Sequence, residues 1–100
     1  MQTYPTKQDL ELIKGFSQLK NEIEVASFLR DLLTPSEIEE FSKRFQIARL
    51  LWTTTKSYID IARKVETSTT TVTRVSHWLY KESNKGYALV LDRIYGKSQR

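Results

Sequence analysis

The chain has 100 residues, with 16 Lys and Arg against 12 Asp and Glu, no Cys and a single His. This length predicts one domain, residues 1–100. The lack of cysteine excludes a disulfide framework and a thiolate zinc site, and one histidine cannot form a metal-binding cluster. No run of about 18 apolar residues could span a membrane, and the N-terminus lacks the layout of a signal peptide. We therefore expect a small soluble protein of the cytoplasm that holds neither a metal nor a cofactor.

The excess positive charge lies in the last third of the chain. Residues 1–33 sum to −1, residues 34–66 to +1 and residues 67–100 to +4. A basic segment beside near-neutral ones is typical of a protein that binds a polyanion, but a solvated basic face would give the same sum. Charge alone leaves both interpretations open.

Apolar residues at helical spacing predict three helices in the first half of the chain. The first two stripes are separated by a polar turn near residues 20–22, and their members are Leu12, Ile13, Phe16, Leu19 and Ile23, then Val25, Phe28, Leu29 and Leu32. Thr34 before Pro35 is typical of an N-cap, and it predicts a helix over residues 35–52. That helix is apolar on two faces, so it needs burial on more than one side, which suggests a subunit interface as well as a core.

The second half predicts a helix-turn-helix over residues 57–79. A helix from Ser57 to about Val65 is followed by a turn at residues 66–69 and by a second helix. The residues at the offsets that such a unit requires are the small Ala62 and the apolar Ile61, Val65, Val72 and Val75. Glu66 lies where glycine is usual, and a left-handed backbone there would cost roughly 1 kcal/mol. A last amphipathic helix over residues 87–95 follows the segment 84–86, which gives six helices and an all-α fold.

The start of the second helix has the residue types that contact DNA. Thr67 or Ser68 can cap this helix, whose free N–H groups favour an anion, and hydroxyls and cations around that end suit phosphates and base edges. The candidate DNA contacts are Ser57, Thr67, Ser68, Thr69, Thr70, Thr71, Thr73, Arg74 and His77. The alternative is a threonine-rich helix end that caps itself beside a solvated arginine.

The sequence does not predict an enzyme. His77 is the one candidate for acid–base chemistry, and a lone histidine of this kind is usually structural. The acids Glu37, Glu39 and Glu40 suit the positive end of a helix dipole, and the chain has no Gly-rich phosphate loop.

Three stretches resemble the Trp repressor family, and most closely its YerC/YecD-type branch. They are Leu33–Glu37, Lys43–Ile47 and Thr71–Ser76, within a resemblance that covers roughly residues 25–95. The resemblance implies six helices per subunit in an intertwined homodimer, with residues 57–79 as the part that reads DNA.

The effector pocket is where this chain departs from the family. Arg44 and Arg74 match the two arginines that flank bound tryptophan in Trp repressors, and Thr34 matches a position in the pocket wall. Val75 replaces a glycine and Trp78 replaces a serine, and both changes add bulk where the indole would lie. We expect the protein's own side chains to occlude this pocket, so that tryptophan is not an effector and any other effector is unknown. Arg44 is then available to pair with an acid or to reach a phosphate.

These observations predict a homodimer that binds double-stranded DNA in a sequence-specific manner. It would regulate transcription, as a repressor, without tryptophan as corepressor. The alternative is a protein-interaction module of helix-turn-helix shape that docks on the transcription machinery, for which Glu66 and the modest net charge leave room.

Overall fold

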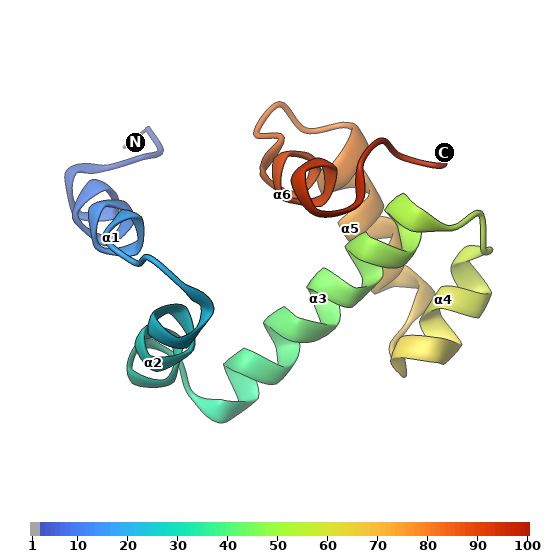
Figure 1. Cartoon of the computed structure of the whole chain (residues 1–100). Helices are drawn as coiled ribbons and strands as arrows, with labels where there is room; N and C mark the ends of the chain where they lie inside the picture. The colour runs from blue at the N-terminus through green and yellow to red at the C-terminus, as the bar shows by residue number, and fades with distance from the viewer. Residues whose placement is uncertain (1–2) are drawn as a thin grey trace. The chain divides into compact units, whose positions relative to one another are not determined.

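The computed structural model describes residues 3–100, which form six α-helices and no strand (Figure 1). The helices are α1 (Lys7–Ser17), α2 (Glu22–Leu32), α3 (Pro35–Thr53), α4 (Tyr58–Val65), α5 (Thr69–Tyr80) and α6 (Gly86–Tyr95). The predicted all-α, six-helix class is therefore confirmed. No helix in the described residues is long and apolar enough to cross a membrane. The chain divides into an N-terminal unit that ends at Ile38 and a C-terminal unit, Glu39–Arg100.

Two capped helices make up most of the N-terminal unit. Thr6 and Asp9 form a capping box at the start of α1, and the Asn21 side chain accepts the amide of Glu24 at the start of α2. One edge-to-face pair, Phe16 with Phe28 at 5.0 Å between ring centroids, joins the two helices. No residue of either helix is buried in the single chain.

The turn expected near residues 20–22 is present, but the first apolar stripe was extended too far. Leu19 and Ile23 were expected to continue the first stripe, but α1 ends at Ser17 and Ile23 belongs to α2. The reason is the Asn21 side chain, whose bond to the backbone starts a new helix and competes with continuation of the old one.

Thr34 caps α3 as predicted. Its Oγ1 accepts the amide of Glu37 at 3.2 Å, and its own N–H donates to the Glu37 carboxylate at 2.9 Å. These backbone and side-chain bonds from Thr34 hold the pKa of the Glu37 carboxyl below its usual range.

The C-terminal unit holds the hydrophobic core, built where α4, α5 and α6 gather around the C-terminal half of α3 (Figure 1). Helices α3, α4 and α5 supply most of the core, whereas α6 supplies only Leu91. The buried residues are Ile47, Ala48, Leu50, Leu51, Trp52, Ile61, Ala62, Val65, Val72, Val75, Leu79 and Leu91. Helix α5 ends at Tyr80, before the segment 84–86 that was expected to end it, and Gly86 begins α6.

The turn between α4 and α5 is a left-handed C-cap. Glu66 has φ 61° and ψ 55°. Its N–H donates to the carbonyl of Arg63 at 3.2 Å, and the N–H of Thr67 donates to that of Ala62 at 2.9 Å, which is the Schellman pattern. Glu66 therefore lies in the left-handed region, the case in which a residue with a Cβ carries the strain.

Candidate nucleic-acid interface

The α4–α5 pair presents one polar face of α5 to solvent. Val72, Val75 and Leu79 are buried on the opposite face, against the small Ala62 and its apolar neighbours on α4. The five candidate residues of α5 that are exposed are Thr69, Thr70, Thr73, Arg74 and His77. This burial pattern fixes which side of α5 is available to a partner.

Several of the candidate hydroxyls also make local bonds. The Ser57 Oγ accepts the amide of Asp60 at 3.1 Å at the start of α4. The Ser68 Oγ accepts the amide of Thr71 at 3.1 Å and lies 3.0 Å from that residue's hydroxyl. The Thr73 hydroxyl donates to the α5 backbone at 3.0 Å. Self-capping thus accounts for part of the hydroxyl cluster, whereas Thr69 and Thr70 face solvent at the positive end of the helix dipole.

Arg74 and His77 differ in their surroundings. Arg74 is exposed and has no ion-pair partner among the described residues, so its charge is open to an anion. The Nε2 of His77 lies 2.9 Å from the Glu82 carboxylate, beyond the end of α5. Sequence reasoning missed this acid because it follows the helix, five residues away from the histidine.

Four of the five predicted effector residues line one small pocket between α3 and α5. Arg44, Arg74, Val75 and Trp78 share it with Thr67, Thr71, Glu40 and Lys43, around a volume of about 140 Å³. Val75 and Trp78 lie in the wall of this small hollow, and the expected occlusion of the effector pocket stays a prediction. Thr34 lies in the other unit, and its predicted place in the pocket wall stays a prediction.

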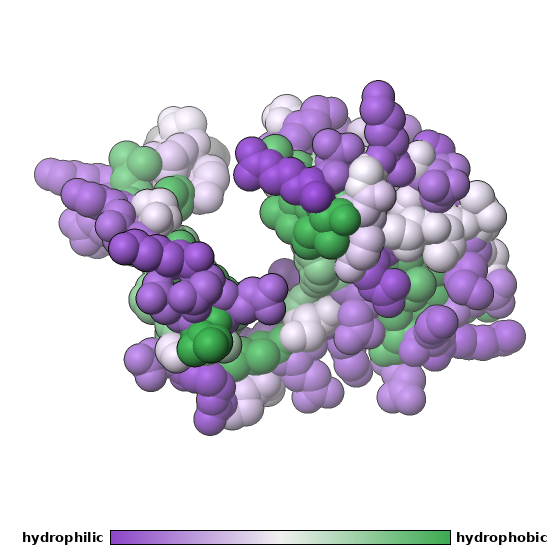
Figure 2. Space-filling model, viewed as in Figure 1, coloured by the Kyte–Doolittle hydropathy of each residue, from purple (hydrophilic) through white to green (hydrophobic). Residues whose placement is uncertain are grey.

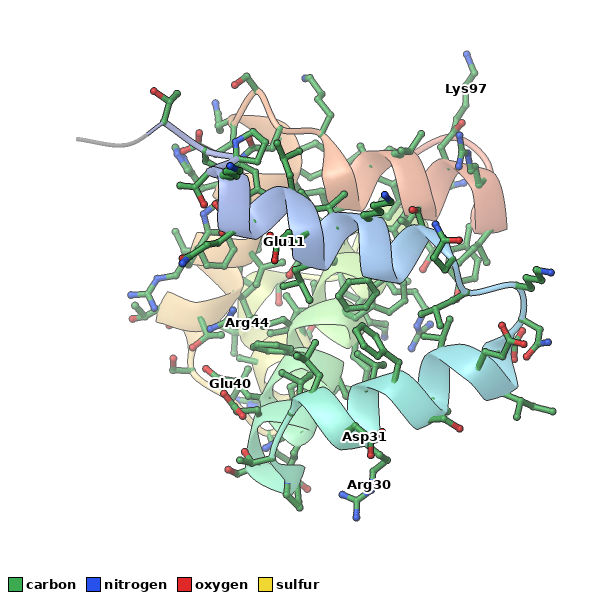
Figure 3. All side chains as sticks on the ribbon, turned by 90° about the vertical axis from the view of Figure 1, so that its left-hand side faces the viewer. Glu11, Arg30, Asp31, Glu40, Arg44 and Lys97 are labelled. Carbon is green, nitrogen blue, oxygen red and sulfur yellow. The ribbon has the colours of Figure 1, made fainter. Side chains whose placement is uncertain are left out.

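The Arg44 side chain already makes several contacts with neighbouring residues of its own chain. Its Nη2 lies 3.0 Å from the Glu40 Oε1, and the two side chains lie beside each other on α3 (Figure 3). Its guanidinium also lies over the rings of Phe41, at 5.3 Å, and Trp78, at 5.7 Å. These contacts favour a structural role over a phosphate contact for Arg44.

A second, larger hollow opens on the other side of Arg44 and Trp78. It has a volume of about 580 Å³ and is mostly apolar, with Phe45, Tyr87 and Val90 in its wall. Burial raises the pKa of the Tyr87 phenol, and the positive charge of Arg44 opposes this rise.

Other residues around α4 escaped the sequence analysis. The Tyr58 hydroxyl lies 2.6 Å from the Ser76 Oγ and joins α4 to α5, through a pair that lies 18 positions apart in the chain. Arg63 and Lys64 are exposed in the last turn of α4. Their positions beside the helix-turn-helix could have marked them as candidate phosphate contacts. Among the described residues, no group of three or more His, Cys, Asp or Glu side chains could hold a metal ion.

Comparison with known proteins identifies the family. The family model described as Trp repressor protein matches residues 7–95. The chain belongs to the Trp repressor family. Within this family it is similar to the uncharacterized protein YerC of Bacillus subtilis strain 168, with 32% identity over 84 residues, which cover 84% of this chain and 79% of YerC.

Solved structures of Trp repressor relatives have the same architecture. The crystal structure of a TrpR-like protein from Eubacterium eligens is 34% identical, with a TM-score of 0.79 over 90% of this chain and 91% of that one. A second crystal structure, from Staphylococcus aureus, is 32% identical, with a TM-score of 0.77 over 88% and 86% of the two chains. The chain is therefore a Trp repressor-like protein of the YerC type, in a regulatory family whose helix-turn-helix binds DNA.

Proposed function

We propose that the protein is a homodimeric repressor of transcription that binds a palindromic site in double-stranded DNA and needs no tryptophan. The observation that carries this proposal is the exposed polar face of α5, on a helix pair that buries Ile61, Ala62, Val65, Val72, Val75 and Leu79 in the core. In a helix-turn-helix dimer, the two copies of the second helix enter successive major grooves about 34 Å apart. The hydroxyls and Arg74 on this face suit phosphates and base edges.

The charge on the helix-turn-helix sets the expected salt dependence. Arg63, Lys64 and Arg74 are its exposed cations, which gives about six phosphate contacts per dimer if each cation makes one. The logarithm of the affinity should then fall against the logarithm of the salt concentration with a slope of about −5. Asp60 and Glu66 reduce the local charge, so we expect moderate non-specific binding.

Exposed apolar surface supports the homodimer. Helices α1 and α2 bury no residue, and Leu10 and Ile23 are 53% and 79% exposed. On α6, Leu89 and Ile94 are 52% and 58% exposed, and Figure 2 shows apolar surface over this helix. Apolar patches of this kind mark interaction sites on small proteins. Sedimentation equilibrium should therefore give twice the 11.8 kDa mass of one chain.

The size of the small pocket supports the independence from tryptophan. Its volume of about 140 Å³ is below the roughly 300–1,000 Å³ of pockets that enclose larger ligands, and the hollow of about 580 Å³ beside it lacks Arg74 and Val75. Arg44, which would flank the ligand, already has Glu40 and the Trp78 ring as neighbours. Titration calorimetry with L-tryptophan should give no heat of binding at millimolar ligand, and tight binding would contradict the proposal.

Salt titration of duplex binding tests the DNA interface itself. Arg74→Ala should weaken binding and make the salt slope shallower by about 1 per subunit, since one phosphate contact is lost. Arg93→Ala, which removes the same charge from α6, is the matched control and should leave the slope almost unchanged. A shallow slope for the unmodified protein, with no response to Arg74→Ala, would contradict the proposal and favour the protein-docking module.

A further inference from the structure

The C-terminal end of α3 has to be capped by groups from outside the helix. The last carbonyls of an α-helix have no partner within it, and a cation near that end is favourable because of the helix dipole. The last turn of α3 contains no basic residue. The hydroxyl and N–H of Thr54 bond the carbonyl of Leu50, so the carbonyls of Leu51 and Trp52 are among those that still need a partner.

Residues 96–100, which we call the C-terminal clasp, provide these partners. The Arg100 Nε donates to the carbonyl of Leu51 at 2.7 Å, and the N–H of Gln99 donates to that of Trp52 at 2.8 Å. In return, the Trp52 indole Nε1 donates to the carbonyl of Gly96 at 2.6 Å. The clasp therefore caps α3 and places a guanidinium at the negative end of its dipole.

The same segment reaches the start of the helix-turn-helix. The Arg100 Nη2 donates to the carbonyl of Lys56, directly before the Ser57 cap of α4. One guanidinium thus joins the end of α3 to the linker that enters α4. The chain after α6 runs past the end of α3 toward this linker (Figure 1).

Tyr80, the last residue of α5, ties the clasp to the second helix of the pair. Its hydroxyl lies 2.9 Å from the Ser98 Oγ and donates to the carbonyl of Leu51 at 3.3 Å. Its ring stacks on Trp52, with 6.2 Å between centroids and 7° between planes. The clasp therefore contacts α3, the entry to α4 and the end of α5.

We propose that the C-terminal clasp is a positioning element for DNA binding, with Arg100 as its main residue. It bonds the last turn of α3 and the linker residue Lys56, so that α4 and α5 leave α3 in one orientation. This inference rests on the proposed DNA-binding function, because the orientation of α5 in each subunit sets its fit to the groove. Arg100 acts through the backbone carbonyls of Leu51 and Lys56 and needs no contact with a phosphate.

The test compares two variants that break the clasp with a control variant, Lys97→Met, which loses the same charge as Arg100→Met. Arg100→Met removes the bonds to Leu51 in α3 and to Lys56 in the linker, and Ser98→Ala removes a clasp contact without a change of charge. Lys97→Met is the control, since the Lys97 side chain points away from the molecule (Figure 3) and has no hydrogen bond or ion pair among the described residues. Duplex affinity, the salt slope and the NMR signal of the Trp52 indole N–H are measured for each.

The two clasp variants should weaken duplex binding by about 3- to 10-fold, because each loses one or two hydrogen bonds. The salt slope should stay unchanged, because no phosphate contact is lost. Their Trp52 indole signal should move upfield, and Lys97→Met should change neither the affinity by more than about twofold nor the indole signal. A shallower slope for Arg100→Met, with no effect of Ser98→Ala, would overturn the proposal, because Arg100 would then be a phosphate contact.

Failure of the clasp is distinguishable from failure of the proposed function. If the unmodified protein binds no duplex, the proposed function fails and the positioning role for DNA fails with it. Amide exchange in residues 54–57 then tests the contacts themselves: Arg100→Met should accelerate it, and an unchanged rate would show that the clasp does not hold the linker.

Discussion

Replacement of Glu66 by glycine should stabilise the protein. Glu66 has φ 61° and ψ 55°, a conformation that disfavours a residue with a Cβ by about 1–2 kcal/mol. Glycine removes this penalty but loses about 0.5–1 kcal/mol of additional backbone entropy on folding. The net gain is about 0.5–1 kcal/mol. With an m-value of about 2 kcal/mol/M in urea, the unfolding midpoint should rise by roughly 0.3–0.5 M at fixed protein concentration.

Two further variants separate backbone strain from other effects. Lys81→Gly changes the cap at the end of α5, where φ is −107°, so glycine should lower the midpoint there. Glu66→Ala removes the carboxylate but keeps the Cβ, so it should not increase stability to the extent of Glu66→Gly. Both Glu66 variants should strengthen duplex binding at low salt, because a negative charge is lost beside the DNA. A midpoint that falls in Glu66→Gly would refute the argument from the left-handed turn.

Three other changes test particular contacts. Ile61 is fully buried, so Ile61→Ala should lower the free energy of unfolding in urea by about 2–5 kcal/mol. Ile59 is 57% exposed, so Ile59→Ala should change it by no more than about 0.5 kcal/mol. Equal effects of the two variants would contradict the assigned core. The bonds from Thr34 lower the pKa of the Glu37 carboxyl, so this cap stabilises the fold above the unfolded-state pKa of Glu37. That stabilisation is lost as the pH falls through the lower, folded-state pKa. Amide exchange at the start of α3 should therefore become faster at acid pH, and this acceleration should be absent in Glu37→Ala. Tyr58→Phe should lower the free energy of unfolding by about 0.5–1.5 kcal/mol through loss of the hydrogen bond between α4 and α5, and no change would show that this exposed bond contributes nothing.

Local chemistry made much of the fold predictable. Apolar spacing located the buried stripes, and the caps at Thr34, Ser57 and Ser68 depend on side chains that bond amides three positions away. The register of the helix-turn-helix placed Glu66 at the turn position where glycine is usual, and the structure gives it a left-handed backbone. The turn near residues 20–22 was predicted, but Ile23 was assigned to the first stripe because the apolar period continues through Asn21, where the cap starts a new helix.

The site was less predictable because its contacts are distant in sequence. The Arg44–Glu40 pair is an i, i+4 contact on one helix and was foreseen as an option. The stacking of Trp78 over Arg44 and the bond from Arg100 to Leu51 join positions 34 and 49 residues apart, which no local pattern encodes. Bulk at Val75 indicated a reduced pocket, but only the packing of the surrounding helices shows that about 140 Å³ remains.

The central claim is tested most directly by capture of sheared genomic DNA with the purified protein, near physiological salt, with and without L-tryptophan, followed by sequencing. The account predicts that a palindrome with half-sites about one helical turn apart is enriched in both conditions. Enrichment only in the presence of tryptophan would contradict the narrowed pocket, and no enrichment in either condition would contradict the DNA-binding function.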